Sequence, residues 1–319
     1  MNSKLNHPAT TYTSRFYKSE SDLLQMQALL MKARAQTDDW HYAHVGELLF
    51  NFFIVACHLD PTETIRLWYA GDELVGYAIL GEDPSIDFHV LPEYGWRGIE
   101  AEAMAWAKTK GSGLRRGDPQ SWSGNFVSGA RQDNEKRIAF LEREGFRPGG
   151  EFSEVNMIRP LSQPLPQVVI PPGCQVRSMG DAYDVANRAA AHREVWQPWS
   201  VGNVSDEDYS YFMQLPGYCR DLDVVAITPD GVIAAYVNGW IDPLNRVGDF
   251  GPVGARPTYR RRGLTRAVLV ECLHRMRAHG MQRVCVSTGI SNTPALRLYE
   301  SIGFVPVNQY IEFVKPLDE

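Results

Sequence analysis

The chain has 319 residues, enough for two domains, and its 44% hydrophobic and 22% charged content is ordinary for a globular protein. A net charge of −6 gives no indication of a nucleic-acid partner, and no apolar run is long enough to span a membrane, so we expect neither partner. The five cysteines include no Cys-x-x-Cys pair, and residues 1–11 lack a signal-peptide core, which favours a reducing cytoplasm without structural zinc.

The first half of the chain alternates strand and helix patterns, with a turn at Gly71–Asp72 between two of the strands. Strands are expected at 12–17, 64–70, 73–80, 87–90, ending near 126, and at 151–158. Helices are expected at 19–35, 40–57, 98–110 and 133–144.

Residues 160–173 contain five prolines and predict a stiff linker between domains. The same order of elements then restarts. Strands are expected at 174–179, 223–228, 232–240, 249–255, 283–287 and from Phe304, and helices at 181–194, 205–213, 265–279 and 293–302.

A basic glycine turn connects the strand ending near Ala255 to the helix that begins at Thr265. Such a turn brings backbone N–H groups and the positive end of a helix dipole together, which favours phosphate binding. Gly263 lacks a Cβ and lets a ligand approach the backbone closely.

Two motifs carry a resemblance to a known family. Arg260-x-x-Gly263-x-Thr265 resembles the acetyl-CoA pyrophosphate signature of the GNAT superfamily of N-acetyltransferases, with Thr265 replacing the usual Gly or Ala. The second motif, which resembles the downstream GNAT signature, is Asn292-x-x-Ala295-x-x-Leu298-Tyr299-x-x-x-Gly303-Phe304.

The chain also reads as an internal repeat. Asn134 and Gly145 are spaced as Asn292 and Gly303 are, and residues 93–100 parallel 258–265. We therefore predict an α/β fold of two tandem GNAT-like domains, each a central mixed sheet with a splayed fourth strand flanked by helices. The expected ranges are 1–159 for a degenerate domain, 160–173 for the linker and 174–319 for the catalytic domain.

The first half departs from the family pattern at three positions: Gly95 replaces the usual Arg or Gln, Glu100 the last small residue, and Leu141 the tyrosine. A carboxylate at 100 would repel a pyrophosphate, and leucine cannot donate a proton. This half is expected to act as a scaffold, with a retained non-catalytic ligand pocket as the alternative.

The resemblance implies acetyl-CoA as co-substrate and no metal. Backbone groups of Val253, Gly254 and Ala255 would then hold the pantetheine arm, and Asn292 would contact it. The pyrophosphate would be held by the turn and the start of the helix, at Arg260, Arg261, Arg262, Gly263, Leu264, Thr265 and Arg266.

Acetyl transfer needs a proton acceptor for the amine and a proton donor for the leaving thiolate. By the same resemblance Tyr299 would be the donor; its alternative role is a core aromatic, and that of Asn292 a plain helix cap. Asp249 is the first candidate base, unless it is a surface acid paired with Arg246. Glu194 is the second.

The segment 192–199, with Tyr209, Tyr211 and Tyr218 nearby, forms either an aromatic acceptor wall or ordinary core. His41 and His44 share a helical spacing, but no third ligand suggests a metal.

The resemblance thus predicts an N-acetyltransferase whose C-terminal domain acetylates a small-molecule amine by direct attack in a ternary complex, in a tandem arrangement similar to that of the mycothiol synthases. It would act as a monomer or homodimer. Two alternatives stay open: a non-catalytic acyl-CoA-binding or regulatory protein, and a protein or peptide N-acetyltransferase.

Overall fold

The computed structural model describes residues 12–37, 40–51, 59–81, 85–111, 124–149, 153–180, 182–198 and 202–317. The first half contains β1 (Thr13–Phe16), α1 (Glu20–Gln36), α2 (Val45–Phe50), α3 (Pro61–Thr64), β2 (Ile65–Ala70), β3 (Glu73–Gly81), β4 (Ser85–Val90), α4 (Ile99–Gly111), β5 (Asn125–Arg131), α5 (Glu135–Arg143), β6 (Arg147–Pro148) and β7 (Glu154–Pro160).

The second half repeats this order. It contains β8 (Gln175–Ser178), α6 (Ala182–Trp196), α7 (Asp206–Phe212), the 3-10 helix η4 (Arg220–Leu222), β9 (Asp223–Ile227), β10 (Ile233–Asp242), β11 (Val247–Ala255), the 3-10 helix η5 (Pro257–Tyr259), α8 (Leu264–Ala278), β12 (Arg283–Gly289), α9 (Thr293–Ser301) and β13 (Val305–Pro316).

The predicted elements agree with these in order and type, but the short α3 and β6 and the two 3-10 helices were not predicted. Three further differences concern predicted segments. Only Val45–Phe50 of the helical stretch 40–57 is described as α-helix, and residues 52–58 lie outside the described residues. Phe126 lies near the start of β5, not near a strand end. Pro160 ends β7, where it pairs with Arg283, so the segment without helix or strand begins after it.

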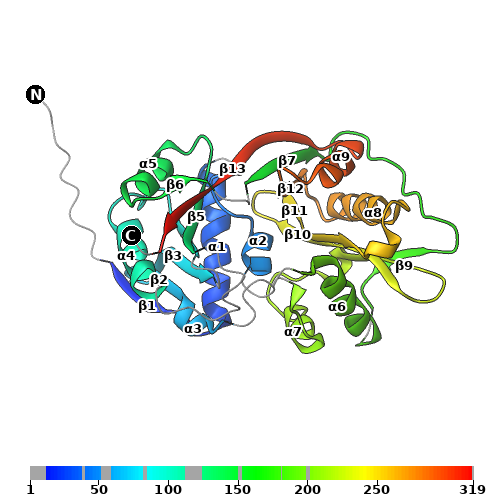
Figure 1. Ribbon diagram of the computed structural model, residues 1–319, viewed down its shortest axis with the longest axis horizontal. Helices are drawn as coiled ribbons and strands as arrows, with labels where there is room; N and C mark the ends of the chain where they lie inside the picture. The colour runs from blue at the N-terminus through cyan, green and yellow to red at the C-terminus, as the bar shows by residue number, and fades with distance from the viewer. Residues whose placement is uncertain are drawn as a thin grey trace, which may run out of the picture.

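The strands in the described residues belong to one 13-stranded sheet, in the order β1-β2-β3-β4-β5-β13-β7-β12-β11-β10-β9-β8, with β6 paired to β13 (Figure 1). The predicted mixed sheet is confirmed. A separate central sheet in each half is wrong, because the two halves exchange their last strands.

This exchange joins the halves. The last strand of the first half, β7, pairs along its whole length with β12 of the second half. The long strand β13 pairs with β7 over Val305–Tyr310 and then with β5 of the first half over Tyr310–Pro316. In Figure 1, β13 crosses the top of the molecule from one half to the other.

Close packing against the sheet explains why α8 lies where it does. Its buried face contains Leu264, Val268, Cys272 and Met276, which recur every four residues as expected of an apolar helix face. A Cβ at Gly239 of β10 would come within 2.7 Å of both Cys272 Sγ and Met276 Cε. The glycine therefore allows the helix to approach the strand.

The repeat is visible in a matched pair of ion pairs. Arg15 of β1 donates to the Asp22 carboxylate of α1 from Nη2 and Nη1, at 2.6 and 2.8 Å, and the Lys18 N–H donates to the same carboxylate. Arg177 of β8 holds Asp184 of α6 in the same way, at 2.5 and 2.9 Å, assisted by the Gly180 N–H. Each pair ties the first strand of its half to the first long helix.

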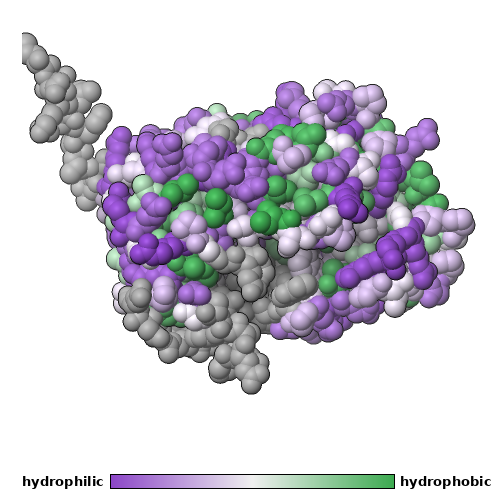
Figure 2. Space-filling model, turned by 45° about the horizontal axis from the view of Figure 1, so that its top comes forward, coloured by the Kyte–Doolittle hydropathy of each residue, from purple (hydrophilic) through white to green (hydrophobic). Residues whose placement is uncertain are grey.

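The face shown in Figure 2 is mainly hydrophilic, with hydrophobic side chains in small separate patches. Within the described ranges, every helix is too short or too polar to cross a membrane. The cysteines in those ranges, Cys174, Cys219, Cys272 and Cys285, are free.

Candidate active site

The centre of the site is the point where β11 leaves β12. The two strands pair in parallel only from Val247 to Phe250, whereas β11 stays paired with β10 as far as Ala255. The ladder between β11 and β12 therefore stops before Val253, Gly254 and Ala255, the residues predicted to hold a pantetheine arm. A Cβ at Gly254 would lie 2.8 Å from Tyr236 Oη and 2.7 Å from Val195 Cγ1, so only glycine fits there.

The basic turn lies directly after this strand, at the start of α8. Arg260, Arg261, Arg262 and Gly263 are exposed, and no atom outside the turn lies within 4 Å of a Cβ placed on Gly263. Gly263 caps the helix with φ +81°, a conformation that favours glycine. The helix N-terminus and three exposed guanidinium groups suit the two phosphates of a CoA molecule.

The other residues predicted to bind the pyrophosphate, Leu264, Thr265 and Arg266, begin helix α8. Leu264 is buried, which anchors the helix in the core, while Thr265 and Arg266 are half-buried. Helix α8 therefore begins normally with Thr265 in place of the family's Gly or Ala.

Helix α9 begins as expected, with Asn292 as its cap. The Asn292 side chain accepts a hydrogen bond from the Ala295 N–H, so the cap role is confirmed. Its amide group also donates to Thr288 Oγ1 at 3.3 Å. A contact with pantetheine stays a prediction.

Tyr299 of α9 is 5% exposed and its ring packs against Phe304, with centroids 5.8 Å apart. Among the described residues, its hydroxyl has no hydrogen-bond partner. Burial raises the pKa of Tyr299, and the charge of Asp249 raises it further. Its ring belongs to the core, and its hydroxyl is kept protonated.

Asp249 lies on β11, four residues before Val253, and is half-buried. Burial raises its pKa to about 7, and Glu154 adds to the rise, while Arg34 opposes it. No ion pair joins Asp249 to Arg246 within the described parts of the chain, so the surface-pair alternative is wrong. A carboxyl group that titrates near neutrality suits proton transfer.

Glu194, the second candidate base, lies near the end of α6. Its carboxylate is ion-paired with Arg256 at 2.5 Å and its side chain is 48% exposed. Because the Glu194 side chain is already engaged with Arg256, Asp249 is the better candidate base.

Carboxyl groups from other elements interact electrostatically with Asp249 or with one another, and the sequence reasoning missed them. We call Glu47 of α2, Asp87 of β4, Glu154 of β7 and Asp249 the acidic cluster. Burial of its carboxyl group, followed by repulsion from Glu154, raises the pKa of Glu47 to about 8, although the residue as a whole is exposed. Burial also raises the pKa of Glu154.

Asp87 is the member of the acidic cluster that is held ionised. Burial would raise its pKa, but the neighbouring His89 and Arg137 outweigh burial and lower the pKa. Helix α2 contacts β10 and β11, which is how a first-half element reaches the second-half site. No local pattern in the sequence indicates these contacts.

The aromatic residues near α6 and α7 are mostly core. The hydroxyls of Tyr209 and Tyr218 both donate to Asp223, at 2.7 and 2.8 Å, so an acceptor-wall role is wrong for these two. Trp196 donates to Tyr236 Oη at 3.0 Å and lies against Phe50 of α2, with ring centroids 6.4 Å apart. Trp199 lies outside the described residues.

Both ring nitrogens of His44 lie near backbone groups. His44 caps α2 through Nδ1 and its Nε2 lies 3.2 Å from the Val247 carbonyl oxygen. Within the described ranges, no three His, Cys, Asp or Glu side chains gather in a way that could hold a metal ion.

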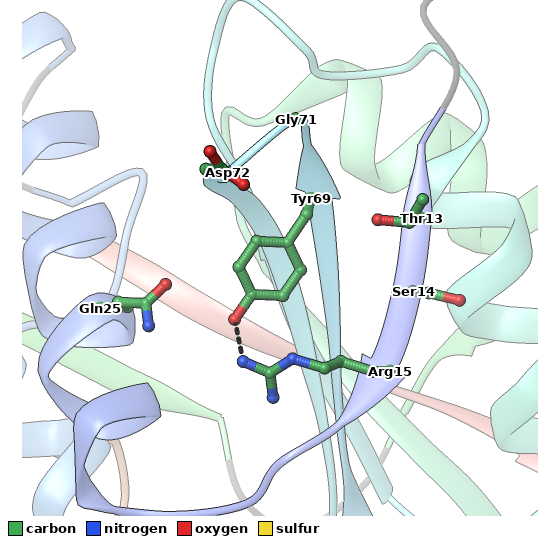
Figure 3. A pocket seen from close by; sticks show the side chains of 7 residues that line it. All are labelled: Thr13, Ser14, Arg15, Gln25, Tyr69, Gly71 and Asp72. Atoms are coloured by element: carbon green, nitrogen blue, oxygen red, sulfur yellow. Dashed lines mark hydrogen bonds between the residues drawn. The ribbon is translucent and has the colours of Figure 1, made fainter.

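A hollow elsewhere on the surface is lined by Thr13, Ser14, Arg15, Gln25, Tyr69, Gly71 and Asp72 (Figure 3). Arg15 and Asp72 are the charged residues in this lining, and Arg15 donates to Tyr69 Oη at 2.6 Å as well as to Asp22. Because Arg177 and Asp184 repeat this ion pair in the second half, the pair is part of the fold and we assign no ligand to the hollow.

Comparisons with known proteins agree with this geometry. Residues 189–304 match the model of the Acetyltransferase (GNAT) family. The chain is 29% identical over 251 residues to the mycothiol acetyltransferase of Thermobispora bispora, covering 75% of this chain and 79% of the relative. It is 27% identical over 249 residues to that of Nocardia farcinica, covering 74% and 77%.

Solved structures show the same fold. A tandem GNAT protein from the clavulanic acid biosynthesis pathway aligns over 96% of this chain and 99% of its own, with a TM-score of 0.65 and 12% identity. A GCN5-related N-acetyltransferase from Sphaerobacter thermophilus aligns over 96% of both chains, with a TM-score of 0.63 and 22% identity. At these identities the likeness concerns the fold alone.

The family match within the second half, the relatives and the repeated fold together make the chain similar to the tandem GNAT acetyltransferases. It is an acyltransferase, and acetyl-CoA is the co-substrate that the family uses.

Proposed function

We propose that this protein transfers the acetyl group of acetyl-CoA to the amine of a small molecule, and that the second half carries out the reaction. The observation that supports this most directly is Asp249, a half-buried carboxyl group with a pKa of about 7, on the strand that diverges from β12. The basic turn that suits the cofactor's phosphates begins a few residues further along the chain.

In this proposal acetyl-CoA lies along Gly251–Ala255, with its phosphates at Arg260–Arg266. Asp249 takes a proton from the attacking ammonium or amine, directly or through water, and Tyr299 gives a proton to the departing thiolate. A backbone N–H near Val253 polarises the acetyl carbonyl. The raised pKa of Tyr299 keeps its proton available at neutral pH.

A small acceptor is supported by what surrounds Asp249. Glu47 from α2 and Glu154 from the exchanged strand β7 lie close enough to influence the pKa of the cluster, so both halves contribute to the acceptor side. Those of these carboxyl groups that are ionised attract a protonated amine. The named activity of the relatives, mycothiol acetylation, also concerns a small molecule.

The test is a thiol-release assay with acetyl-CoA and a panel of small amines, beginning with cysteine-containing amino sugars and including short peptides. Turnover with a small amine, lost in Asp249→Asn, supports the proposal. Turnover with peptides alone would instead favour a peptide acetyltransferase. Binding of acetyl-CoA without turnover of any amine would favour the acyl-CoA-binding alternative.

A further inference from the structure

The first half retains the backbone of a cofactor site. Strand β4 pairs with β5 only at Ser85 and Val127 and then diverges, as β11 diverges from β12. The turn before α4 also has the same shape as the basic turn: Trp96 and Gly98 have φ of +62° and +119°, and Arg261 and Gly263, at the same spacing, have φ of +60° and +81°.

A carboxylate occupies the anion position of that turn. Glu100 follows Gly98 by two residues, as Thr265 follows Gly263. Its Oε1 accepts the Trp96 N–H at 2.6 Å, the kind of backbone donor that a phosphate oxygen would take. The side chain is 4% exposed, and Oε2 has no hydrogen-bond partner in the described chain. The turn therefore holds the protein's own anion.

A guanidinium fills the opening between β4 and β5. Arg137 follows the capping Asn134 by three residues, as Ala295 follows Asn292. It is 8% exposed, and it donates to Gly129 O of β5 at 2.6 Å and to Phe88 O of β4 at 2.9 Å. The carbonyls that could receive an inserted ligand are thereby already bonded.

Phe88 matters because it corresponds to Val253. Each precedes the turn glycine of its half with the same spacing, and each pairs with the preceding strand, Phe88 with Ala78 and Val253 with Val237. Arg137 thus lies where the second half is proposed to receive the pantetheine arm. Between the turn and α5, the Trp96 ring packs on Phe140, with centroids 5.5 Å apart.

We infer that the first half is a latent CoA site closed by its own side chains, with Glu100 in place of the pyrophosphate and Arg137 in place of the pantetheine arm. The second half has Thr265 and Ala295 at these positions and is open at both. The inference rests on the proposed function only for the identity of the cofactor.

The experiment counts CoA sites by calorimetric titration in full-length variants that copy second-half residues into the first half. In a Gly263→Trp background, which removes the second-half site, Glu100→Thr with Arg137→Ala should restore one CoA per chain. The matched control in the same background replaces exposed neighbours on the same helices, Glu102→Thr with Lys136→Ala, and should restore none.

Three outcomes of the titration are decisive. Two sites in the wild type, or none in the opened variant when circular dichroism shows it folded, would overturn the inference. Absence of any CoA binding by the wild type would count against the proposed function instead.

Hydrogen exchange on the wild type provides a test that does not depend on a variant folding. The Trp96 amide should be protected without CoA and unchanged when CoA is added, while amides of residues 261–266 should gain protection. A CoA-dependent change at Trp96 would contradict a closed first-half site.

Discussion

The carboxyl group of Asp249 on β11 lies close enough to the hydroxyl of Tyr299 on α9 for its charge to raise the pKa of Tyr299. Tyr299 is buried and Asp249 half-buried, and their pKa values are far apart: that of Asp249 is about 7, whereas that of Tyr299 lies well above neutrality. Two titrating groups with separated pKa values in one site are the arrangement expected of a base and an acid.

Replacing Asp249 with Asn should lower kcat roughly 100- to 10,000-fold, the range for loss of a positioned base. Because the base acts as a carboxylate, the wild-type rate should rise with pH through about 7, and the variant should lose this limb of the profile. Measuring kcat from pH 5.5 to 9 tests both points. A variant with the wild-type profile would rule out Asp249 as the base.

Replacing Tyr299 with Phe removes the hydroxyl and keeps the ring that packs on Phe304. We expect kcat to fall by roughly 100-fold or more, with little change in the Kd of acetyl-CoA or in the melting temperature. Single-turnover kinetics with calorimetry separates the effects. An unchanged rate of the chemical step would show that Tyr299 only packs in the core.

Replacing Gly263 with Trp should abolish acetyl-CoA binding, because it fills the open turn and places a side chain on a residue with φ +81°. The matched control is Gly98→Trp, which imposes a comparable backbone strain at φ +119° in the closed turn of the first half. Calorimetry should show wild-type binding by the control. Equal loss in both variants would point to general unfolding.

The acidic cluster should make stability depend on pH. An unfolded Glu titrates near pH 4.3, whereas the folded pKa of Glu47 is about 8. Between these values the folded state holds a proton that the unfolded state has released, so the free energy of unfolding falls as pH rises. Urea unfolding at pH 5 and 8.5 should show a smaller fall for Glu47→Gln, and an identical fall would contradict the shift.

The repeated ion pairs should contribute similarly to stability. Arg15 and Arg177 each lower the pKa of their partner carboxyl, Asp22 and Asp184, so this stabilisation is present above about pH 4 and is lost as pH falls further. Asp22→Asn and Asp184→Asn should each cost about 1–2 kcal/mol at pH 7.

The control for this pair of variants is Asp206→Asn. Both side chains of the Asp206–Arg193 ion pair are exposed, so loss of this pair should change the free energy of unfolding little. A large difference between Asp22→Asn and Asp184→Asn would show that the two pairs are not equivalent.

Much of the second half could be predicted because its features are local in sequence. The turn at Gly263, the Asn292 cap and the buried face of α8 follow from spacing and residue type within short windows. The same holds for Glu100, whose charge alone indicated a defective phosphate turn.

The acceptor side could not be predicted, for a physical reason. Glu47 and Glu154 come near Asp249 only because α2 packs on β11 and β7 pairs with β12. Strand patterns indicate which face of a strand is buried but not which strand will be its neighbour. The position of Arg137 between β4 and β5 was missed for the same reason, since its partners are carbonyls on these two strands.

The strand exchange also bears on how the chain is made. While the ribosome is still synthesising the middle of the chain, β7 has no β12 to pair with, and β5 has an open edge that only residues 310–316 will cover. The first half must therefore wait, incompletely folded, until almost all of the second has been made. During that interval its exposed strand edges are available to other chains, so co-expression with a chaperone should increase the yield of active protein more than it would for a tandem protein with closed domains.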